Sequence, residues 1–211
     1  MKIAVDVMGT DYGPAEIIKG VLQAVKEYGC DAVLVGDEDV IKAELRREHE
    51  ENNPHVTIHH ASEVIEMKDH PGISVKKKRD ASIVVATDLL RQKECDALVI
   101  GTPVYWGNIS GQMKLMFDRI VPAMMGESKL GIPIALHKGK KAVIVTACTT
   151  IWPFSWIARQ TSNANHAMKE ILGYSGFKIV GKLVLPGTKK KNGVTQKIIN
   201  KAKRLALKLN K

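Results

Sequence analysis

Short apolar runs alternate along the chain with longer stretches in which apolar residues recur every three or four positions. The short runs are rich in β-branched residues and are bounded by turn residues, which predicts strands. They lie at Ile3–Val7, Ala32–Val35, Val56–Ile58, Ala97–Ile100, Lys141–Ala147 and Phe177–Leu185. Because strands and helices alternate, we predict an α/β fold, a three-layer sandwich around a mostly parallel sheet of five to six strands.

The longer stretches each place apolar side chains on one face of a helix. The first begins at Pro14 and stops at Gly29, which are residue types typical of helix starts and ends. Residues 80–91 contain consecutive β-branched residues that favour a strand, but we predict a helix because parallel strands need a crossover. The other expected helices cover residues 38–51 and the stripes Met113–Met124, Ala164–Leu172 and Val194–Leu209, and Gly131–His137 is expected to be irregular.

Composition is that of an ordinary globular chain of 211 residues, 45% of them hydrophobic and 26% charged. This length predicts a single domain over residues 1–211. No apolar run reaches the length of a membrane span, and the first residues lack the apolar segment of a signal peptide. Cys30, Cys95 and Cys148 form no Cys-x-x-Cys pair, so a disulfide framework or a metal site is not expected. We predict a cytoplasmic protein.

Charge is divided unevenly along the chain. Residues 1–95 hold 13 Lys+Arg and 18 Asp+Glu, a net charge of −5, whereas residues 96–211 hold 19 and 4, a net charge of +15, which together give the total of +10. Such an asymmetry fits either an anion-binding half or two segments of different ancestry. The basic residues near the carboxyl terminus are read as a solvated helix face, and no specific nucleic-acid partner is predicted.

The segment Gly101–Ser110 carries the clearest candidate chemistry. It follows Ala97–Ile100, which is predicted to be a fully buried strand, and precedes a predicted helix. Ligands in open α/β sheets usually bind at the carboxyl ends of strands. Tyr105 and Trp106 offer ring faces, while Asn108 and Ser110 offer polar side chains near the start of the helix. This composition suits a flat heteroaromatic ligand, although packing of the rings and capping of the helix would explain the same residues.

Gly101-Thr-Pro-Val-Tyr-Trp-Gly-Asn-Ile-Ser-Gly-Gln-Met-Lys114 with Asp118-Arg119 closely resembles the flavin-ring loop of flavodoxin-like NAD(P)H-dependent FMN reductases and quinone reductases. The resemblance continues through Lys140–Thr150 and Trp152–Phe154 and covers residues 96–211. It implies a flavodoxin-like (Rossmann-like) fold, FMN and NAD(P)H as cofactors, and a small-molecule electron acceptor of the quinone type. Trp152–Trp156 would either roof a flat ligand or seal a homodimer contact.

The same resemblance implies binding residues rather than catalytic ones, because the cofactor carries the hydride chemistry. The cofactor-binding candidates that it supplies are Thr102, Pro103, Val104, Tyr105, Trp106, Gly107, Asn108, Thr146, Cys148 and Thr149. For Cys148 a small buried thiol is the simpler interpretation, since no base lies near it in sequence. No catalytic side chain and no metal ligand is predicted. His55, His59 and His60 lie around the end of a predicted strand, but nothing else in the sequence suggests a further ligand that would complete a metal site there.

A second resemblance covers residues 1–92. Met1–Pro14, Val35-Gly-Asp37, His60–Met67 and Lys76–Asp80 are similar to the amino-terminal part of the phosphate acyltransferases of phospholipid synthesis, which move an acyl group from acyl carrier protein to phosphate. That family has a Gly where Thr10 stands and a Gly-Asn-Thr-Gly loop after the strand at 97–100. The chain therefore looks like a chimera of the two families, joined near residues 93–96.

The join removes a part that FMN binding needs. In the reductases, a loop rich in Ser, Thr and Asn after the first strand holds the FMN phosphate at a helix amino terminus. Here Asp6–Pro14 takes that place, where Asp6 and Asp11 repel a phosphate and Pro14 lacks a backbone donor. We predict weak FMN binding or none, unless the Gly9 backbone and Thr10 substitute for the missing loop.

Three functional hypotheses follow. The first is an NAD(P)H-dependent FMN-binding oxidoreductase, impaired by the missing phosphate loop. The second is a phosphate acyltransferase-like protein of phospholipid synthesis. The third is a folded chimera without catalytic activity.

Overall fold

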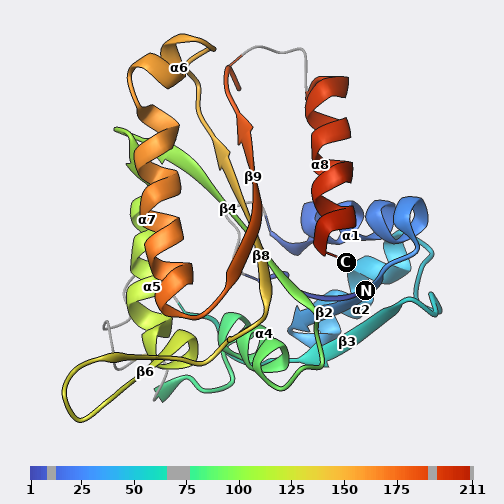
Figure 1. Cartoon of the computed structure of the whole chain (residues 1–211). Helices are drawn as coiled ribbons and strands as arrows, with labels where there is room; N and C mark the ends of the chain where they lie inside the picture. Colours follow the sequence, from blue (N-terminus) through green and yellow to red (C-terminus); the bar gives the residue numbers. More distant parts are fainter. Residues whose placement is uncertain (9–12, 66–76, 190–193, 210–211) are drawn as a thin grey trace. The chain divides into compact units, whose positions relative to one another are not determined.

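The computed structural model describes residues 1–8, 13–65, 77–189 and 194–209, and the chain divides into two compact units (Figure 1). Unit 1 comprises Met1–Asp96 with Asp118–Met124, and unit 2 comprises Ala97–Phe117 with Met125–Lys211. The boundary at Asp96 falls at the predicted join of the two sequence resemblances. The single domain expected over residues 1–211 stays a prediction.

Unit 1 is a three-stranded parallel sheet with strand order β1-β2-β3. Its elements follow one another as two βαβ crossovers and a further helix. They are β1 (Lys2–Asp6), α1 (Pro14–Tyr28), β2 (Asp31–Gly36), α2 (Glu38–Arg47), β3 (Val56–His60) and α4 (Ser82–Arg91). The ambiguous segment before the join is therefore a helix, as predicted, and it lies against β1 and β2.

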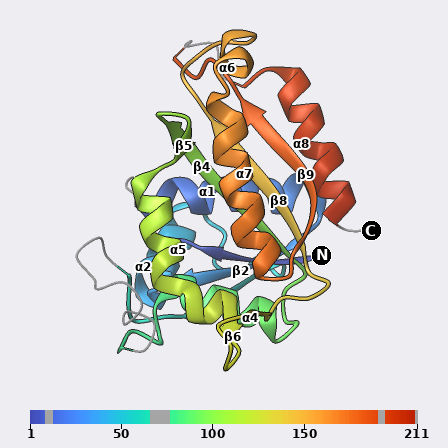
Figure 2. The ribbon, with the colours of Figure 1, turned by 60° about the vertical axis from the view of Figure 1, so that its left-hand side comes forward.

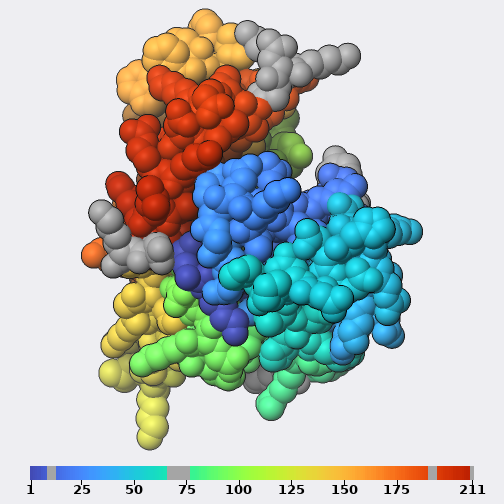
Figure 3. Space-filling model, turned by 90° about the vertical axis from the view of Figure 1, so that its right-hand side faces the viewer, coloured from blue at the N-terminus to red at the C-terminus, as the bar shows by residue number. Residues whose placement is uncertain are grey.

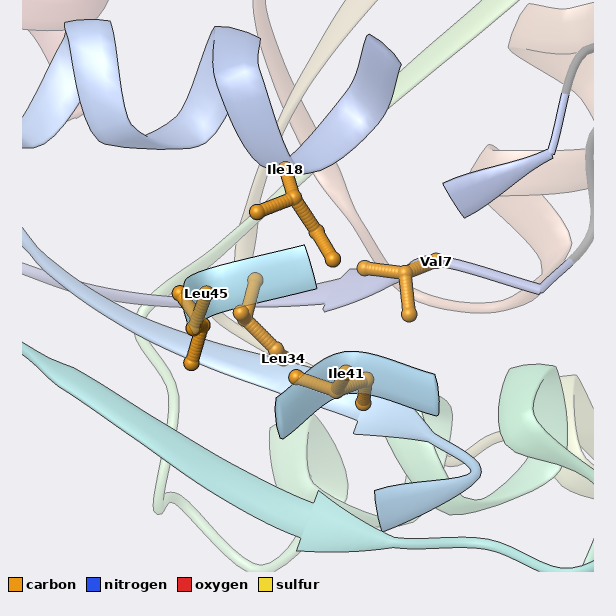
Figure 4. Close-up of a cluster of buried hydrophobic side chains, with 5 residues drawn as sticks. All are labelled: Val7, Ile18, Leu34, Ile41 and Leu45. Atoms are coloured by element: carbon orange, nitrogen blue, oxygen red, sulfur yellow. The ribbon is translucent and has the colours of Figure 1, made fainter. Parts of the chain in front are cut away.

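The core of unit 1 forms where both crossover helices meet the central strand (Figure 4). Ile18 of α1 and Ile41 and Leu45 of α2 pack with Leu34 of β2 and with Val7, all of them buried. Helix α1 begins at Pro14, and Gly29 caps its end in the left-handed conformation at φ 59°, as the sequence predicted. Helix α2 ends at Arg47, before the expected residue 51.

Unit 2 is built around a four-stranded sheet with order β5-β4-β8-β9, in which β4, β8 and β9 are parallel (Figure 2). A separate antiparallel pair, β6 with β7, occupies part of the segment expected to be irregular. The elements are β4 (Ala97–Tyr105), β5 (Asn108–Ile109), β6 (Met125–Glu127), β7 (Pro133–Ala135), β8 (Lys141–Ala147), α6 (Phe154–Ile157), α7 (Gln160–Tyr174), β9 (Lys178–Leu185) and α8 (Gln196–Leu209). Helix α5 (Gly111–Met124) contributes residues to both units.

Two helices cover opposite faces of this sheet. Gly181 of β9 faces α8, because a Cβ atom there would lie 2.2 Å from a methyl carbon of Leu205. On the neighbouring strand, Val143 pairs with Gly181 and shares its face, whereas Thr146, three residues further on, points to the other face and contacts Asn165 of α7. Unit 2 is therefore three layers, α7, sheet and α8, and the predicted α/β class is confirmed.

The sheet edge differs from the prediction in two respects. Strand β4 does not stop at Ile100 but runs on to Tyr105, so the first half of the expected loop is strand. It is also not fully buried, since Val99 is about half exposed. Over the described residues, no helix is long and apolar enough to span a bilayer.

Candidate functional site

The segment expected to bind a flat ligand is a tight β-hairpin. Val104 pairs with Ile109 and Tyr105 with Asn108, which leaves Trp106 and Gly107 as a two-residue turn. Both turn residues have positive φ, 51° and 76°, as a turn of type I′ requires. This conformation is ordinary for glycine and unfavourable for a bulky residue such as tryptophan.

The hairpin presents its aromatic residues to solvent. Trp106 is fully exposed, and Tyr105 is 61% exposed. The side chain of Asn108 folds back, and its Oδ1 accepts a hydrogen bond from the Ile109 N–H at 2.8 Å. The ring faces are thus available to a ligand, while one Asn108 acceptor is already used by the chain itself.

Hydroxyl groups at the base of the hairpin hold it in place. The Thr102 hydroxyl, which is buried, donates to the Pro103 carbonyl at 2.9 Å and accepts from the Ser110 N–H at 3.2 Å. The Ser110 Oγ accepts from the Met113 N–H at 3.1 Å and so caps the start of α5. The simpler interpretation of Ser110, helix capping, is therefore what its side chain does.

The second predicted loop leaves the sheet at the same edge. Thr102 and Pro103 of β4 are in register with Thr146 and Ala147 of β8, and parallel strands end side by side. The Thr146 side chain is buried and accepts a hydrogen bond from the Asn165 Nδ2 at 3.4 Å, whereas Thr149 is exposed. Among the cofactor-binding candidates predicted in this loop, Thr149 is therefore the one that is exposed to solvent.

Cys148 lies inside this loop as a buried thiol. Its Sγ donates to the Thr150 carbonyl at 3.4 Å, and its backbone N–H donates to the Leu185 carbonyl at 2.9 Å. Burial raises the pKa of the Cys148 thiol, so the protonated form dominates at neutral pH. The residue contributes shape to the loop rather than a nucleophile.

The same edge carries an exposed apolar segment, residues 151–157, for which the sequence predicted neither a helix nor a strand. Helix α6 is a single turn between β8 and α7, too short for its periodicity to show. The hairpin tip lies next to the start of α7, because a Cβ atom on Gly107 would be 3.9 Å from Asn163 Nδ2 and from Gln160 Cα. The tip, the 148–150 loop and α6 therefore all belong to one end of unit 2 (Figure 1).

The region after β1 in unit 1 gives little support for a phosphate. The Asp6 carboxylate accepts from the Met8 N–H at 3.0 Å, α1 opens with Gly13 and Pro14, and Glu16 adds negative charge to its first turn. A helix amino terminus that carries carboxylates is poorly suited to a second anion. Gly9 and Thr10, the two candidates for phosphate contact, lie outside the described residues.

Three of the residues that carry the acyltransferase resemblance, Asp37, Ser62 and Asp80, make hydrogen bonds that stabilise the fold of unit 1. Asp37 caps α2 by accepting from the Asp39 and Val40 N–H groups, both at 3.0 Å. The Asp80 carboxylate accepts from the Ser62 backbone N–H at 2.7 Å and from its hydroxyl at 2.6 Å. These hydrogen bonds from Ser62 lower the pKa of Asp80.

Histidines in unit 1 also have local partners. The His55 Nδ1 lies 2.8 Å from the Asp31 Oδ1, and this hydrogen bond lowers the pKa of Asp31. The His60 Nδ1 accepts from the Glu38 N–H at 3.3 Å. Within the ranges that the structure describes, no three His, Cys, Asp or Glu side chains are grouped as they would be around a metal ion.

The amino-terminal half has clear relatives in sequence. Residues 1–104 match the model of a family described as "Fatty acid synthesis protein", which reaches past the expected limit at Gln92. A phosphate acyltransferase of Pelotomaculum thermopropionicum is 50% identical over 99 residues, 47% of this chain and 28% of the relative. One of Dictyoglomus turgidum is 41% identical over 133 residues, 59% and 39% of the two chains. The chain thus spans well under half the length of these curated relatives.

Solved structures resemble the chain in fold. An FMN-dependent NADH-azoreductase of Bacillus anthracis in complex with FMN aligns with a TM-score of 0.51 at 16% identity, covering 99% of this chain and 96% of that one. A putative quinone reductase of Klebsiella pneumoniae aligns with a TM-score of 0.51 at 13% identity, covering 99% and 83%. Residues 1–104 are therefore similar in sequence to phosphate acyltransferases, while the chain has the flavodoxin-like α/β fold of these solved reductases.

Proposed function

We propose that the chain binds the ring system of a flavin at the exposed end of unit 2 and acts as an NAD(P)H-dependent flavin oxidoreductase. The observation that carries the proposal is the fixed hairpin at the carboxyl end of β4, which holds Tyr105 and Trp106 exposed beside the exposed Thr149 loop. Ligands of α/β sheets bind at this position. The similarity in fold to FMN-dependent reductases is consistent with it.

Each part of this edge has a distinct task in the proposal. Tyr105 and Trp106 supply ring faces, and the backbone of residues 102–108 supplies donors and acceptors for the polar edge of the flavin. The hydroxyls of Thr102 and Thr146 are engaged within the chain, so they position the backbone rather than the ligand. A bound flavin would accept hydride from the nicotinamide and pass electrons to a small acceptor of the quinone type.

The phosphate of FMN is expected to add little to this binding. The described residues after β1 carry carboxylates and a proline where an anion site would need donors. Flavin affinity should therefore come from the ring, and riboflavin, which lacks the phosphate, should bind about as well as FMN. In a site with the phosphate-binding loop of the reductases, loss of the phosphate would weaken flavin binding strongly, because charge-assisted hydrogen bonds are among the strongest in proteins.

A titration with both flavins tests the proposal. Purified protein is mixed with FMN or with riboflavin, and quenching of flavin fluorescence gives the two dissociation constants. Similar constants are expected, followed by oxidation of NADH or NADPH when a quinone is added. If neither flavin is bound, the oxidoreductase proposal fails. If FMN binds far more tightly than riboflavin, the ring-only site is wrong and Gly9 and Thr10 become the residues to test.

Sequence similarity favours a second candidate, transfer of an acyl group from acyl carrier protein to phosphate. The chain spans only 28% of the Pelotomaculum relative, so we expect no turnover of an acyl carrier protein thioester with inorganic phosphate. Release of acyl phosphate would establish this candidate. A third outcome is a protein that melts cooperatively while neither flavins nor phosphate shift its melting temperature, which would indicate a folded chimera without either activity.

A further inference from the structure

Residues 151–157, which we call the apolar tip, expose an unusual concentration of apolar side chains. Trp152 and Trp156 are each 72% exposed and Ile157 is 63% exposed, while Ile151 and Phe154 are also exposed. No charged residue interrupts the segment. Single exposed apolar residues are common in proteins, but a contiguous group of them marks a surface that contacts something apolar.

The exposure of the apolar tip is held by the fold. Ser155 is buried, and the Ser155 N–H donates to the Ile151 carbonyl at 3.0 Å within the turn. The preceding residues are fastened to the loop after β9, where the Gly187 N–H donates to the Thr150 carbonyl at 3.0 Å. The tip therefore projects from an anchored base, at the end of unit 2 where the light orange residues around α6 lie beyond the red α8 (Figure 3).

The surroundings of the apolar tip are basic. Arg159 lies two residues after the end of α6. Lys189 follows Thr188, whose N–H donates to the Cys148 carbonyl at 3.1 Å beside the base of the apolar tip. The sequence has no Asp or Glu between Glu127 and Glu170. Unit 2 as a whole contains 18 Lys+Arg and 2 Asp+Glu, a net charge of +16, so it attracts anionic surfaces.

Aromatic and aliphatic side chains that project from a basic surface suit the interface of an anionic membrane. Trp and Phe favour the headgroup region, apolar side chains enter the acyl boundary, and lysine and arginine remain at the charged headgroups. We propose that the apolar tip inserts into the surface of membranes that contain anionic lipids, with Arg159 and Lys189 at the headgroups.

Two other occupants fit the observations less well. A second copy of the chain would bring together two units that each carry +16, which opposes association through this face. A single-stranded nucleic acid would use stacked aromatic rings, but the aliphatic Ile151 and Ile157 offer no stacking face. An anionic lipid surface accounts for both the aliphatic residues and the charge.

Tryptophan fluorescence gives a direct test, because the three tryptophans of the chain, Trp106, Trp152 and Trp156, all lie exposed at this end of unit 2. Protein without added flavin is mixed with vesicles of phosphatidylcholine alone or with added phosphatidylglycerol. We expect a blue shift of the emission and co-sedimentation with the anionic vesicles, both reduced at high salt. Neutral vesicles should cause little change.

Two matched pairs of variants locate the effect. Trp156→Ser should lower the partition coefficient about tenfold or more, because an inserted aromatic side chain is lost. Leu130→Ser, which removes an 85% exposed apolar residue from the turn between β6 and β7, should leave partition unchanged. The charge pair is Arg159→Gln, expected to weaken anionic binding about fivefold, against Lys129→Gln, expected to have little effect.

Circular dichroism verifies that each variant is folded. The proposal is overturned if anionic vesicles neither shift the emission nor sediment the protein, or if Trp156→Ser binds them like the parent chain. A concentration-dependent dimer that Trp156→Ser disrupts would instead assign the tip to a second copy. Oligonucleotide binding that Trp156→Ser removes, without vesicle binding, would assign it to nucleic acid.

Discussion

Trp106 is expected to cost the protein stability, so replacing it should make the fold more stable. Its φ of 51° lies in the left-handed region, which costs a residue with a bulky side chain about 1–2 kcal/mol. The side chain is fully exposed, so it regains nothing through burial. Asparagine tolerates this conformation and is the preferred residue before glycine in such a turn. Trp106→Asn should therefore raise the free energy of unfolding by about 1 kcal/mol.

The same substitution should weaken the proposed ligand site. Stacking of an aromatic side chain on a heteroaromatic ring contributes about 1–3 kcal/mol, so loss of the Trp106 ring should lower flavin affinity about fivefold or more. Guanidinium unfolding measures the first effect, and a melting temperature about 2–4 °C higher should accompany it. Flavin fluorescence titration of the same preparation measures the second. Stability and binding are expected to move in opposite directions.

Tyr174 provides the control, because it is an exposed aromatic residue on α7 with no role in the proposed site. Tyr174→Asn should not stabilise the chain and should leave flavin affinity unchanged. A Trp106→Asn variant that is less stable than the parent would refute the argument from backbone strain. A variant that binds flavin as tightly as the parent would remove Trp106 from the site.

Three further changes test the structure elsewhere. Gly176→Ala should destabilise the chain by about 3–5 kcal/mol, because φ is +94° and the new Cβ would lie 2.9 Å from another Cβ and 3.1 Å from a backbone nitrogen. Gly139→Ala is the control, because Gly139 also has positive φ but nothing lies near a Cβ atom there, and it should cost only about 1–2 kcal/mol. If thermal unfolding gave the same loss of stability for both variants, the close packing around Gly176 would be contradicted. Ser110→Ala should cost about 1 kcal/mol through the lost cap of α5, measured by urea unfolding, and no change would argue against that cap. Ser62→Ala removes the hydroxyl hydrogen bond to Asp80 and should raise the pKa of Asp80 toward its ordinary value, while the backbone N–H of residue 62 still donates. Because the folded-state pKa is lowered, the associated stability is present at neutral pH and lost as pH falls below about 4. An unchanged NMR titration would exclude the Ser62 hydroxyl as a cause of the lowered pKa.

Much of the fold was predictable because local signals and tertiary structure agree. The apolar stripe that starts at Pro14 and the glycine at position 29 define α1, and the β-branched run Lys141–Ala147 is a strand with the predicted bounds. In these segments the local pattern, an apolar stripe in α1 and a continuous apolar run in β8, matches the residues that the fold buries. Where a helix end depends on capping, as at Arg47, the prediction erred by a few residues.

The position of the hairpin between β4 and α5 was predictable, but its conformation was not. Gly101, Pro103 and Gly107 indicated a loop, yet β4 continues through the first two because its pairing with β8 outweighs local preference. The hairpin turn was hidden because tryptophan occupies a position where asparagine is usual. The roles of the Thr102 and Thr146 hydroxyls depend on partners distant in sequence, which no local pattern reveals.

The hydrogen bonds of Asp37 and Asp80 bear on how the similarity to the acyltransferases is interpreted. Residues that connect the chain to the acyltransferases cap a helix and fasten a loop within unit 1, and Gly36 permits close approach of Met8, whose Cγ would lie 2.6 Å from a Cβ at that position. Selection for folding alone is enough to retain such residues. The similarity to the acyltransferases can therefore reflect the folding of unit 1, and it does not require that unit 1 performs their reaction.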